Sequence, residues 1–271
     1  MAYQIRPLSF GEILDRSLRV VLDNALLLIP ILAVVYVPEA LLISIGPRFG
    51  MVVVLVMLFV FPMVQAAMVT AVAEMYLDRP ISIGRAYLAG WDVYLPFLGT
   101  YLLLYLIIIG VMIPAAVLAG FAGAAIASPA AAFLVVLVLL PVGFYLTMRW
   151  SLIGPIMVVE SKFGRTALGR SGALVRGVWW QTFGTIMAAS LIVQLPVAVL
   201  NMIWHSIPIL GSILTGLASS VAWAYSHTVV VVYYFDRRCR VEEFDLLRLA
   251  EQIRSESPAG AQAPSGASTI G

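Results

Sequence analysis

The sequence has little charge, one cysteine and two histidines. Only 11% of its 271 residues are charged, whereas about 25% of the residues in a typical soluble domain are charged. Because Cys239 is the only cysteine, no intrachain disulfide can form. His205 and His227 lie in different segments and cannot by themselves form a metal site. These absences exclude an ordinary soluble domain and a disulfide-stabilised scaffold, and we expect no bound metal.

Familiar catalytic motifs are also absent. The sequence contains no nucleophile elbow, no metalloprotease helix motif, no P-loop, no paired-cysteine motif and no dinucleotide-binding glycine pattern. We therefore expect a protein that is not an enzyme and that uses no cofactor.

Long uncharged runs dominate the sequence instead. Hydrophobic residues make up 62% of the chain, and residues 93–148 and 177–235 contain no Asp, Glu, Lys or Arg. A membrane span needs about 20 apolar residues, so each run accommodates two spans and a turn. Two more spans fit residues 25–45 and 51–73. The sequence predicts an all-α, polytopic membrane protein with six transmembrane helices.

A proline pattern recurs three times. The sequence apolar-Pro-x-Ala-[Leu/Val]-Leu surrounds Pro38, Pro114 and Pro196, each about 30 residues after a predicted helix start. We interpret this periodicity as three helical-hairpin repeats, each preceded by an amphipathic interfacial helix. Together they form a single membrane domain over residues 1–254, with the repeats at about 9–78, 82–160 and 166–238. The alternative, three unrelated spans with ordinary prolines, stays open because membrane helices tolerate proline.

The first interfacial helix has a clear start. Ser9 and Glu12 form a capping box, and apolar residues such as Phe10, Leu18 and Leu22 share one face of the helix that follows. Such a helix lies in the membrane interface or packs on other protein surface. Arginines and tryptophans of the three interfacial segments are candidate contacts to lipid headgroups: Arg16, Arg19, Arg85, Arg170, Arg176, Trp179 and Trp180.

Breaks between the spans follow from small, charged and proline residues. The sequence predicts a small-residue external loop over residues 119–130 and a fourth span that begins near Ala131. A kink or end follows at Gly154-Pro155. Charged residues 236–238 are expected to stop the last span, before an amphipathic cytoplasmic helix at 241–254 and a disordered tail at 255–271.

The basic residues predict an orientation. With six spans, all Lys and Arg residues but Arg48 lie on the same side of the membrane. The positive-inside rule then places both termini in the cytoplasm, and the first apolar run is a retained span rather than a signal peptide. The expected location is a bacterial inner membrane. Because these arginines line the membrane edge, membrane lipids are the expected partners and nucleic acid is not.

Five polar residues are expected near the middle of the membrane. Counted from the predicted span ends at about 1.5 Å per residue, they lie well inside the roughly 30 Å hydrocarbon core: Glu39, Gln65, Arg149, Gln194 and His227. Polar groups at this depth are functional candidates. One hypothesis is that Glu39 and Arg149 pair within a polar layer that binds a substrate or a lipid headgroup. The other is a structural ion pair, or an Arg149 that reaches the inner interface.

Several stretches resemble a known family. They are Arg6–Arg16, Glu74–Gly84, Arg149–Glu160, Arg170–Trp179 and Tyr233–Leu246. The chain is similar in these stretches to bacterial multi-pass proteins named after the membrane domain of glycerophosphoryl diester phosphodiesterases. In some relatives a soluble phosphodiesterase barrel follows this domain, whereas here a tail follows it. The resemblance implies an integral inner-membrane protein and no hydrolysis.

Three functions are consistent with these observations. We prefer a non-enzymatic membrane protein that binds lipid or serves as a subunit of a membrane complex, with a membrane-protein partner or a second copy of the chain. The alternative is a small transporter or permease that uses the mid-membrane polar residues. A further alternative is an intramembrane lipid-modifying enzyme, which requires Glu39 and His227 to converge on one cavity.

Overall fold

The described part of the chain consists of helices joined by short turns. The computed structural model describes residues 6–77, 79–125, 137, 141–204, 207 and 209–243, and no strand occurs among them. The all-α prediction is confirmed. Residues 141–149 are helical, and the labelled elements are α1 (Phe10–Asp23), α2 (Ala25–Ile45), η1 (Pro47–Phe49), α3 (Gly50–Tyr76), α4 (Ile83–Asp92), α5 (Tyr94–Ala125), α7 (Ile153–Val159), α8 (Gly164–Val175), α9 (Trp179–Trp204) and α10 (Leu210–Glu242).

The long helices turn apolar side chains outward and polar ones inward. Leu26 of α2 is 92% exposed and Met202 of α9 is 81% exposed, whereas Ser220 and Thr228 of α10 are fully buried. Soluble proteins bury such apolar residues. Within the described residues, five helical segments are long and apolar enough to cross a membrane: Ala25–Ile45, Gly50–Tyr76, Tyr94–Leu118, Pro141–Val159 and Trp179–Trp204. These features indicate a membrane protein.

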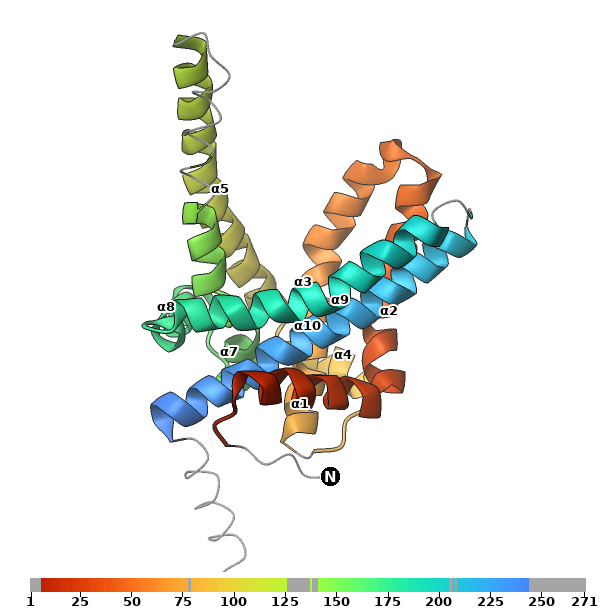
Figure 1. Cartoon of the computed structure of the whole chain (residues 1–271), viewed down its shortest axis with the longest axis vertical. Coiled ribbons are helices and arrows are strands. Elements are labelled where there is room, and N and C mark those ends of the chain that lie inside the picture. The colour runs from red at the N-terminus through yellow and green to blue at the C-terminus, as the bar shows by residue number, and fades with distance from the viewer. Residues whose placement is uncertain are drawn as a thin grey trace, which may run out of the picture.

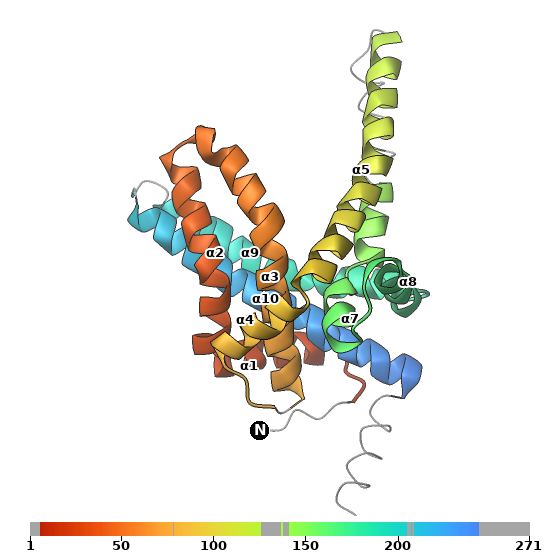
Figure 2. The ribbon, with the colours of Figure 1, turned by 180° about the vertical axis from the view of Figure 1, so that it is seen from behind.

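The long helices fan out from a common base. Figure 1 and Figure 2 show the α2–α3 hairpin, the α9–α10 hairpin and α5 with the helix beside it diverging toward their tips. The short helices α1, α4 and α8 lie at the opposite end, which we call the base; α1 and α8 contact α10 there, and α4 contacts α3. Each short helix directly precedes a long helix that contains a proline, namely Pro38 in α2, Pro114 in α5 and Pro196 in α9.

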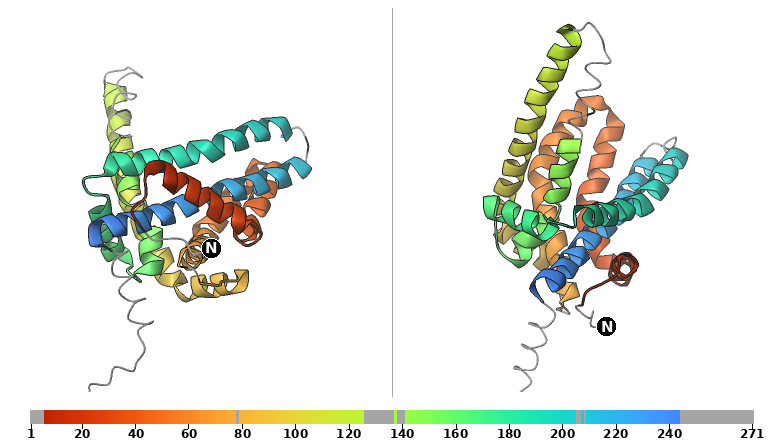
Figure 3. Two further views of the ribbon diagram at one scale, coloured as in Figure 1. Left: turned by 60° about the horizontal axis from the view of Figure 1, so that its bottom comes forward. Right: turned by 60° about the vertical axis from the view of Figure 1, so that its left-hand side comes forward.

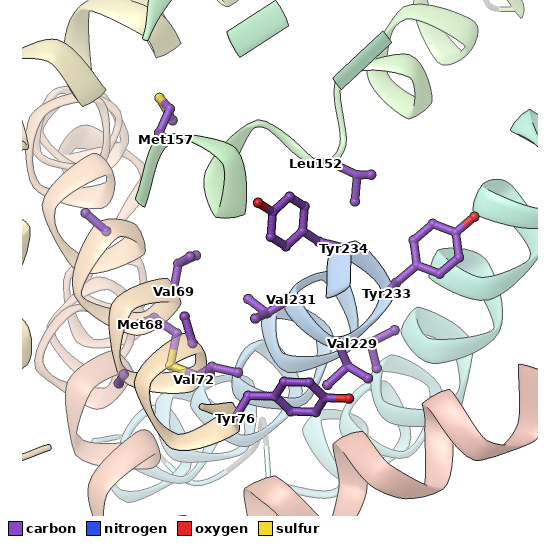
Figure 4. Close-up of a cluster of buried hydrophobic side chains, with 14 of the residues drawn as sticks. Met68, Val69, Val72, Tyr76, Leu152, Met157, Val229, Val231, Tyr233 and Tyr234 are labelled. Carbon is purple, nitrogen blue, oxygen red and sulfur yellow. The ribbon is translucent and has the colours of Figure 1, made fainter. Parts of the chain in front are cut away.

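Helix α10 lies at the centre of the base. It contacts α1, α2, α3, α7, α8 and α9, and Figure 3 shows α1 crossing alongside it. Its C-terminal half is nearly all buried. Figure 4 shows Val229 and Val231 of α10 facing Val72 and Tyr76 of α3, with the Tyr234 ring directed toward the chain segment of α7. The apolar core of the protein is therefore built around one helix.

A glycine allows α10 to approach α2 closely. A Cβ added at Gly216 would lie only 2.5 Å from the Cα of Val37 and 2.8 Å from the carbonyl oxygen of Tyr36. Small residues permit such close helix packing in membrane proteins. The close α2–α10 contact therefore requires glycine, which has no side chain, at position 216.

Buried charges hold the N-terminal segment on α10. Asp236 is 1% exposed. Its carboxylate accepts the backbone N–H of Leu8 at 2.7 Å and pairs with Arg240 at 3.0 Å. Arg240 also donates to the carbonyl oxygen of Leu8 at 2.6 Å. Arg237, next along α10, donates to the carbonyl oxygen of Leu174 in α8 at 3.2 Å.

A second charged network joins α7, α8 and α10. Glu160 accepts hydrogen bonds from Lys162 at 2.7 Å, Tyr234 at 3.0 Å and Arg170 at 3.0 Å. Arg170 also donates to Glu242. Burial alone would raise the pKa of Glu160, but the bonds from Lys162, Tyr234 and Arg170 outweigh it and hold that pKa below its ordinary value. Arg170, expected to contact headgroups, is instead 20% exposed and committed to this network.

The start of α1 was predicted from its cap. Ser9 accepts the Glu12 N–H and Glu12 accepts the Ser9 N–H, so the predicted capping box is confirmed. The bond from the Ser9 amide, together with the Arg6 guanidinium, lowers the pKa of Glu12 to about 2. Ser82 likewise accepts the Arg85 N–H and begins α4. Helix α8 begins after Phe163 rather than at Thr166.

Two predicted helix ends are wrong. Helix α5 continues through Ala125, where a loop over 119–130 was expected, because its alanines are strong helix formers. Helix α10 runs through the charged residues 236–238 to Glu242, because the pairs Asp236–Arg240 and Arg238–Glu242 stabilise the helix at i,i+4 spacing. The remaining predictions for 126–136, 244–254 and 255–271 lie outside the described residues.

The break in the fourth hydrophobic segment falls earlier than expected. The helix over 141–149 gives way to turns at residues 150–152 before α7 begins at Ile153. Pro155 explains this position, because a proline ring clashes with the carbonyl group four residues earlier, here that of Ser151.

We predict that Gly216→Ala destabilises the protein. The new Cβ would overlap the α2 backbone, and overpacking of this kind typically costs about 1–3 kcal/mol. Gly184→Ala in α9 is the matched control, because a Cβ there meets nothing within 4 Å. Thermal unfolding in detergent should show a lower melting temperature for Gly216→Ala alone. Equal melting temperatures for the two variants would contradict the close α2–α10 contact.

We also predict that the Glu160 network loses its contribution to stability in acid. The pKa of Glu160 in the folded protein lies below its ordinary value of 4.5. Its stabilising effect is therefore fully present above pH 4.5 and disappears as the pH falls through the folded pKa. The melting temperature of Glu160→Gln should lie below that of the wild type at neutral pH and approach it in acid.

The control for this prediction is Glu74→Gln. Glu74 pairs with the exposed Arg79 at 3.4 Å, and exposed pairs contribute little to stability. Its melting temperature should stay near that of the wild type at neutral pH. A pH-independent difference between Glu160→Gln and the wild type would show that the network does not act through its charge.

Candidate functional site

A cavity lined by polar groups lies where α3, α5, α7, α9 and α10 meet. Its volume is about 190 Å³, and none of its lining residues is Asp, Glu, Lys or Arg. Hydroxyl, amide, imidazole and indole groups share the wall with aliphatic side chains: Gln65, Val69, Tyr101, Ser151, Gly154, Pro155, Ile186, Ala189, Ser190, Trp223, Ser226, His227 and Val230. We call it the polar cavity.

Two predicted site residues meet in the polar cavity. The side-chain nitrogen Nε2 of Gln65 lies 3.5 Å from Nδ1 of His227, and His227 is only 7% exposed. The other polar atoms of this pair, Oε1 of Gln65 and Nε2 of His227, are buried and have no hydrogen-bond partner. An unpartnered buried polar group costs about 1–3 kcal/mol. Neither atom has a partner within the described protein, and both residues line the cavity.

Two serine hydroxyl groups of the wall already donate hydrogen bonds to backbone carbonyl oxygens. Ser226 Oγ donates to the carbonyl oxygen of Ala222 at 2.9 Å, and Ser151 Oγ donates to that of Met148 at 2.9 Å. Such local bonds satisfy the hydroxyl hydrogens. The oxygen lone pairs of both serines remain available as acceptors.

A tryptophan separates the polar cavity from a larger one. Trp223 lines both cavities; its ring lies 5.5 Å from that of His227 on one side and 6.1 Å from that of Tyr36 on the other. The larger cavity has a volume of about 780 Å³ and includes Glu39, so we call it the Glu39 cavity. Its wall contains many polar residues: Tyr36, Glu39, Ser44, Asn201, Ser212, Thr215 and Ser219.

Arg149 does not join this polar layer. Its guanidinium lies against Gly172 of α8 and donates to the hydroxyl of Tyr145 at 3.3 Å, while its carbonyl oxygen accepts the hydroxyl of Ser171 at 2.9 Å. No ion pair joins it to Glu39, and both residues are among those described. The hypothesis of a Glu39–Arg149 pair is wrong in this structure. The helix break just after Arg149 is the reason, because it places this residue beside α8 at the base.

The five predicted residues thus separate into four groups, with Arg149 alone beside α8. Gln65 and His227 share the polar cavity, and Glu39 lines the neighbouring one. Gln194 is half-buried on α9 and lines neither cavity. Four further residues complete the polar wall without having been predicted: Tyr101, Ser151, Ser190 and Ser226. Only Ser226 had a sequence signal, since it is adjacent to His227.

A second feature is an aromatic groove at the start of α9. Its volume is about 750 Å³, and its lining is nearly all apolar: Leu137, Pro141, Phe144, Tyr145, Trp179, Trp180 and Phe183. The Trp179 and Phe183 rings stack at 5.7 Å, and the Trp179 indole donates to the carbonyl oxygen of Tyr145 at 3.3 Å. Because Arg149 donates to the Tyr145 hydroxyl, a guanidinium lies beside this aromatic groove.

The predicted headgroup contacts differ in exposure. Trp180 is 76% exposed, and Arg85 and Arg176 are exposed. Arg19 is exposed and pairs with Asp15 at 2.9 Å. Arg16 is half-buried and donates to the hydroxyl of Tyr76 at 3.1 Å. Four of these side chains therefore remain on the surface.

The described residues contain no group of three or more His, Cys, Asp or Glu side chains that could hold a metal ion. The single cysteine, Cys239, is buried.

Comparison with known proteins gives a family and no activity. A family model described as a domain of unknown function, DUF8558, matches residues 18–255. The chain belongs to this family. The match extends from within α1 to beyond α10 and so includes both cavities and the aromatic groove. No curated protein and no solved structure matches the chain.

Proposed function

We propose that this protein is an integral component of a bacterial inner membrane that binds membrane lipid and catalyses no reaction. In this proposal both termini are cytoplasmic and the base faces the cytoplasm. The basic side chains at the base, such as Arg176, Arg237 and Arg240, support that orientation. The resemblance to membrane domains that accompany phosphodiesterases is compatible with it.

In the same proposal α10 is a sixth span and the chain contains three repeats. Helix α10 has 33 residues, which at about 1.5 Å per residue exceeds the roughly 30 Å hydrocarbon core. It is less apolar than the five other segments. Its polar side chains, including His227 and Asp236, face the protein interior, so they do not prevent it from spanning a membrane. The recurring order of a short helix and a proline-containing long helix supports the repeats.

The aromatic groove carries the lipid-binding proposal. Its apolar rings match an acyl chain. At one side, Arg149 offers a guanidinium, which recognises phosphate through paired N–H groups. The exposed Trp180 supplies an indole of the kind enriched at headgroup level. The aromatic groove thus has an apolar surface that suits the acyl chain of a phospholipid and, beside it, a cationic group that suits the phosphate of the headgroup.

A role in a membrane complex remains part of this proposal. Helix α5 extends away from the rest of the protein (Figure 3). Large apolar side chains on it are exposed, among them Leu106, Ile113, Leu118 and Phe121. Exposed surface of this kind accommodates lipid, another membrane protein or a second copy of the chain.

A transporter is the second candidate. It is favoured by the two cavities that share Trp223, since polar groups line both of them. An intramembrane enzyme is less favoured, because the Trp223 ring lies between Glu39 and His227 rather than the two residues converging on one cavity.

We predict that Trp180→Ala reduces lipid binding. Trp180 lines the aromatic groove and is 76% exposed, so its removal should take away contact area for an acyl chain without unfolding the protein. Trp91→Ala in α4 is the matched control, because Trp91 is 62% exposed and does not line the groove. Native mass spectrometry of protein extracted from membranes should show several-fold less bound phospholipid for Trp180→Ala.

Arg149→Gln tests the headgroup side of the groove. We expect it to lose preference for anionic over zwitterionic lipid, since it removes the guanidinium and retains a polar side chain. Arg85→Gln, a change at an exposed arginine of α4, should retain the preference. The lipid-binding proposal fails if Trp180→Ala retains as much phospholipid as the wild type and Arg149→Gln retains the preference for anionic lipid.

A further inference from the structure

We propose that the polar cavity is a binding site for a neutral group that carries several hydroxyls. This proposal goes beyond lipid binding in the aromatic groove and does not depend on it. It rests on the two unpartnered atoms of Gln65 and His227, on the uncharged wall and on the volume of the cavity.

The Gln65–His227 pair presents one donor and one acceptor. Gln65 Nε2 faces His227 Nδ1, so Nδ1 accepts and the neutral imidazole carries its proton on Nε2. Nε2 is then an unpartnered donor, and Gln65 Oε1 is an unpartnered acceptor. A hydroxyl group both donates and accepts. One ligand hydroxyl, or two adjacent ones, would satisfy both atoms.

The rest of the wall favours a neutral ligand with more than one hydroxyl. Ser151 and Ser226 use their hydroxyl hydrogens within their own helices and offer lone pairs to further ligand donors. The lining contains no charged side chain, and an ion in such a site would lack a counter-charge. Val69, Ile186 and Val230 supply the apolar contacts that the C–H groups of a polyol need.

The size of the cavity fits a small group. Its volume of about 190 Å³ is roughly six times the ~30 Å³ that one water occupies in the liquid. This space suits a polyol of a few carbon atoms, either as a free molecule or as the headgroup of a lipid. Water alone is the competing occupant, because polar cavities of this volume are often hydrated.

The Glu39 cavity provides a route to the site. Trp223 lines both cavities, and its ring is in contact range of His227. Rotation of this one side chain would connect the two cavities. A hydroxylated ligand would meet polar groups along the whole path, including Glu39, Thr215 and Ser219.

The test observes His227 directly. The sequence has only two histidines, so the full chain labelled with ¹⁵N-histidine and carrying His205→Gln gives one imidazole to follow by NMR. In nanodiscs of phosphatidylcholine, glycerol is titrated as a free polyol. In a second arm, phosphatidylglycerol is added to the nanodiscs, because its headgroup carries the same hydroxyls. We expect a saturable shift of the His227 Nε2 resonance in one of these arms.

Three variants decide whether Gln65 takes part. Gln65→Met and Gln65→Asn should each weaken binding about fivefold or more, since a lost hydrogen bond is worth about 1 kcal/mol. Gln65→Asn retains the amide and provides a second measurement if Gln65→Met folds poorly. Gln194→Met is the matched control and should bind as the wild type does, because Gln194 does not line the cavity.

The outcomes separate the sources of the ligand. Saturation by glycerol supports a free polyol, and saturation only by phosphatidylglycerol supports a lipid headgroup. A response that never saturates in either arm would show that the cavity holds only water and would overturn the proposal. Binding by Gln65→Met and Gln65→Asn at wild-type affinity would also overturn it.

Discussion

The buried carboxylate of Asp236 is the point on which the rest of the base depends. It accepts the backbone N–H of Leu8 and pairs with Arg240, which returns a hydrogen bond to the carbonyl oxygen of Leu8. A buried charge is tolerated only where such partners surround it. This contact fixes the N-terminal segment on α10, and α1 then packs along the same helix. Because α2 follows α1 directly, the first hairpin is positioned from this contact as well.

The same helix explains why the interior is polar at all. Helix α10 contributes Ser220, His227 and Thr228 to the inside of a protein whose outer surface is largely apolar. In an apolar solvent, polar side chains have a lower free energy when they face inward, toward each other or toward a bound molecule. Both cavities border α10 for this reason. The aromatic groove lies outside this arrangement, at the start of α9, and faces the surroundings of the protein.

Periodicity and capping predicted the helices well. Residues 25–45 were predicted for α2, as observed, because an apolar run of this length between Asn24 and Gly46, with Glu39 as its one charged residue, has few alternatives. The end of α10 was predicted wrongly because it depends on side-chain pairing. The pair of Asp236 with Arg240 lets the helix continue past Asp236. Depth counting placed Gln65 and His227 at one level, and their side chains lie in contact. It failed for Arg149, because the count assumed a continuous helix through residues 150–152. Tyr101, Ser151 and Ser190 come from other parts of the chain, and no spacing links them to Gln65 or His227.

The most direct test of this account is the thermal stability of Asp236→Ala in detergent. The substitution leaves the buried N–H of Leu8 without an acceptor, which costs about 1–3 kcal/mol, and also removes the partner of Arg240. Asp15→Ala is the matched control, because Asp15 is exposed and pairs with Arg19 on the surface of α1. The account predicts a clear fall in the melting temperature for Asp236→Ala and little change for Asp15→Ala. Equal melting temperatures for Asp236→Ala and the wild type would contradict it.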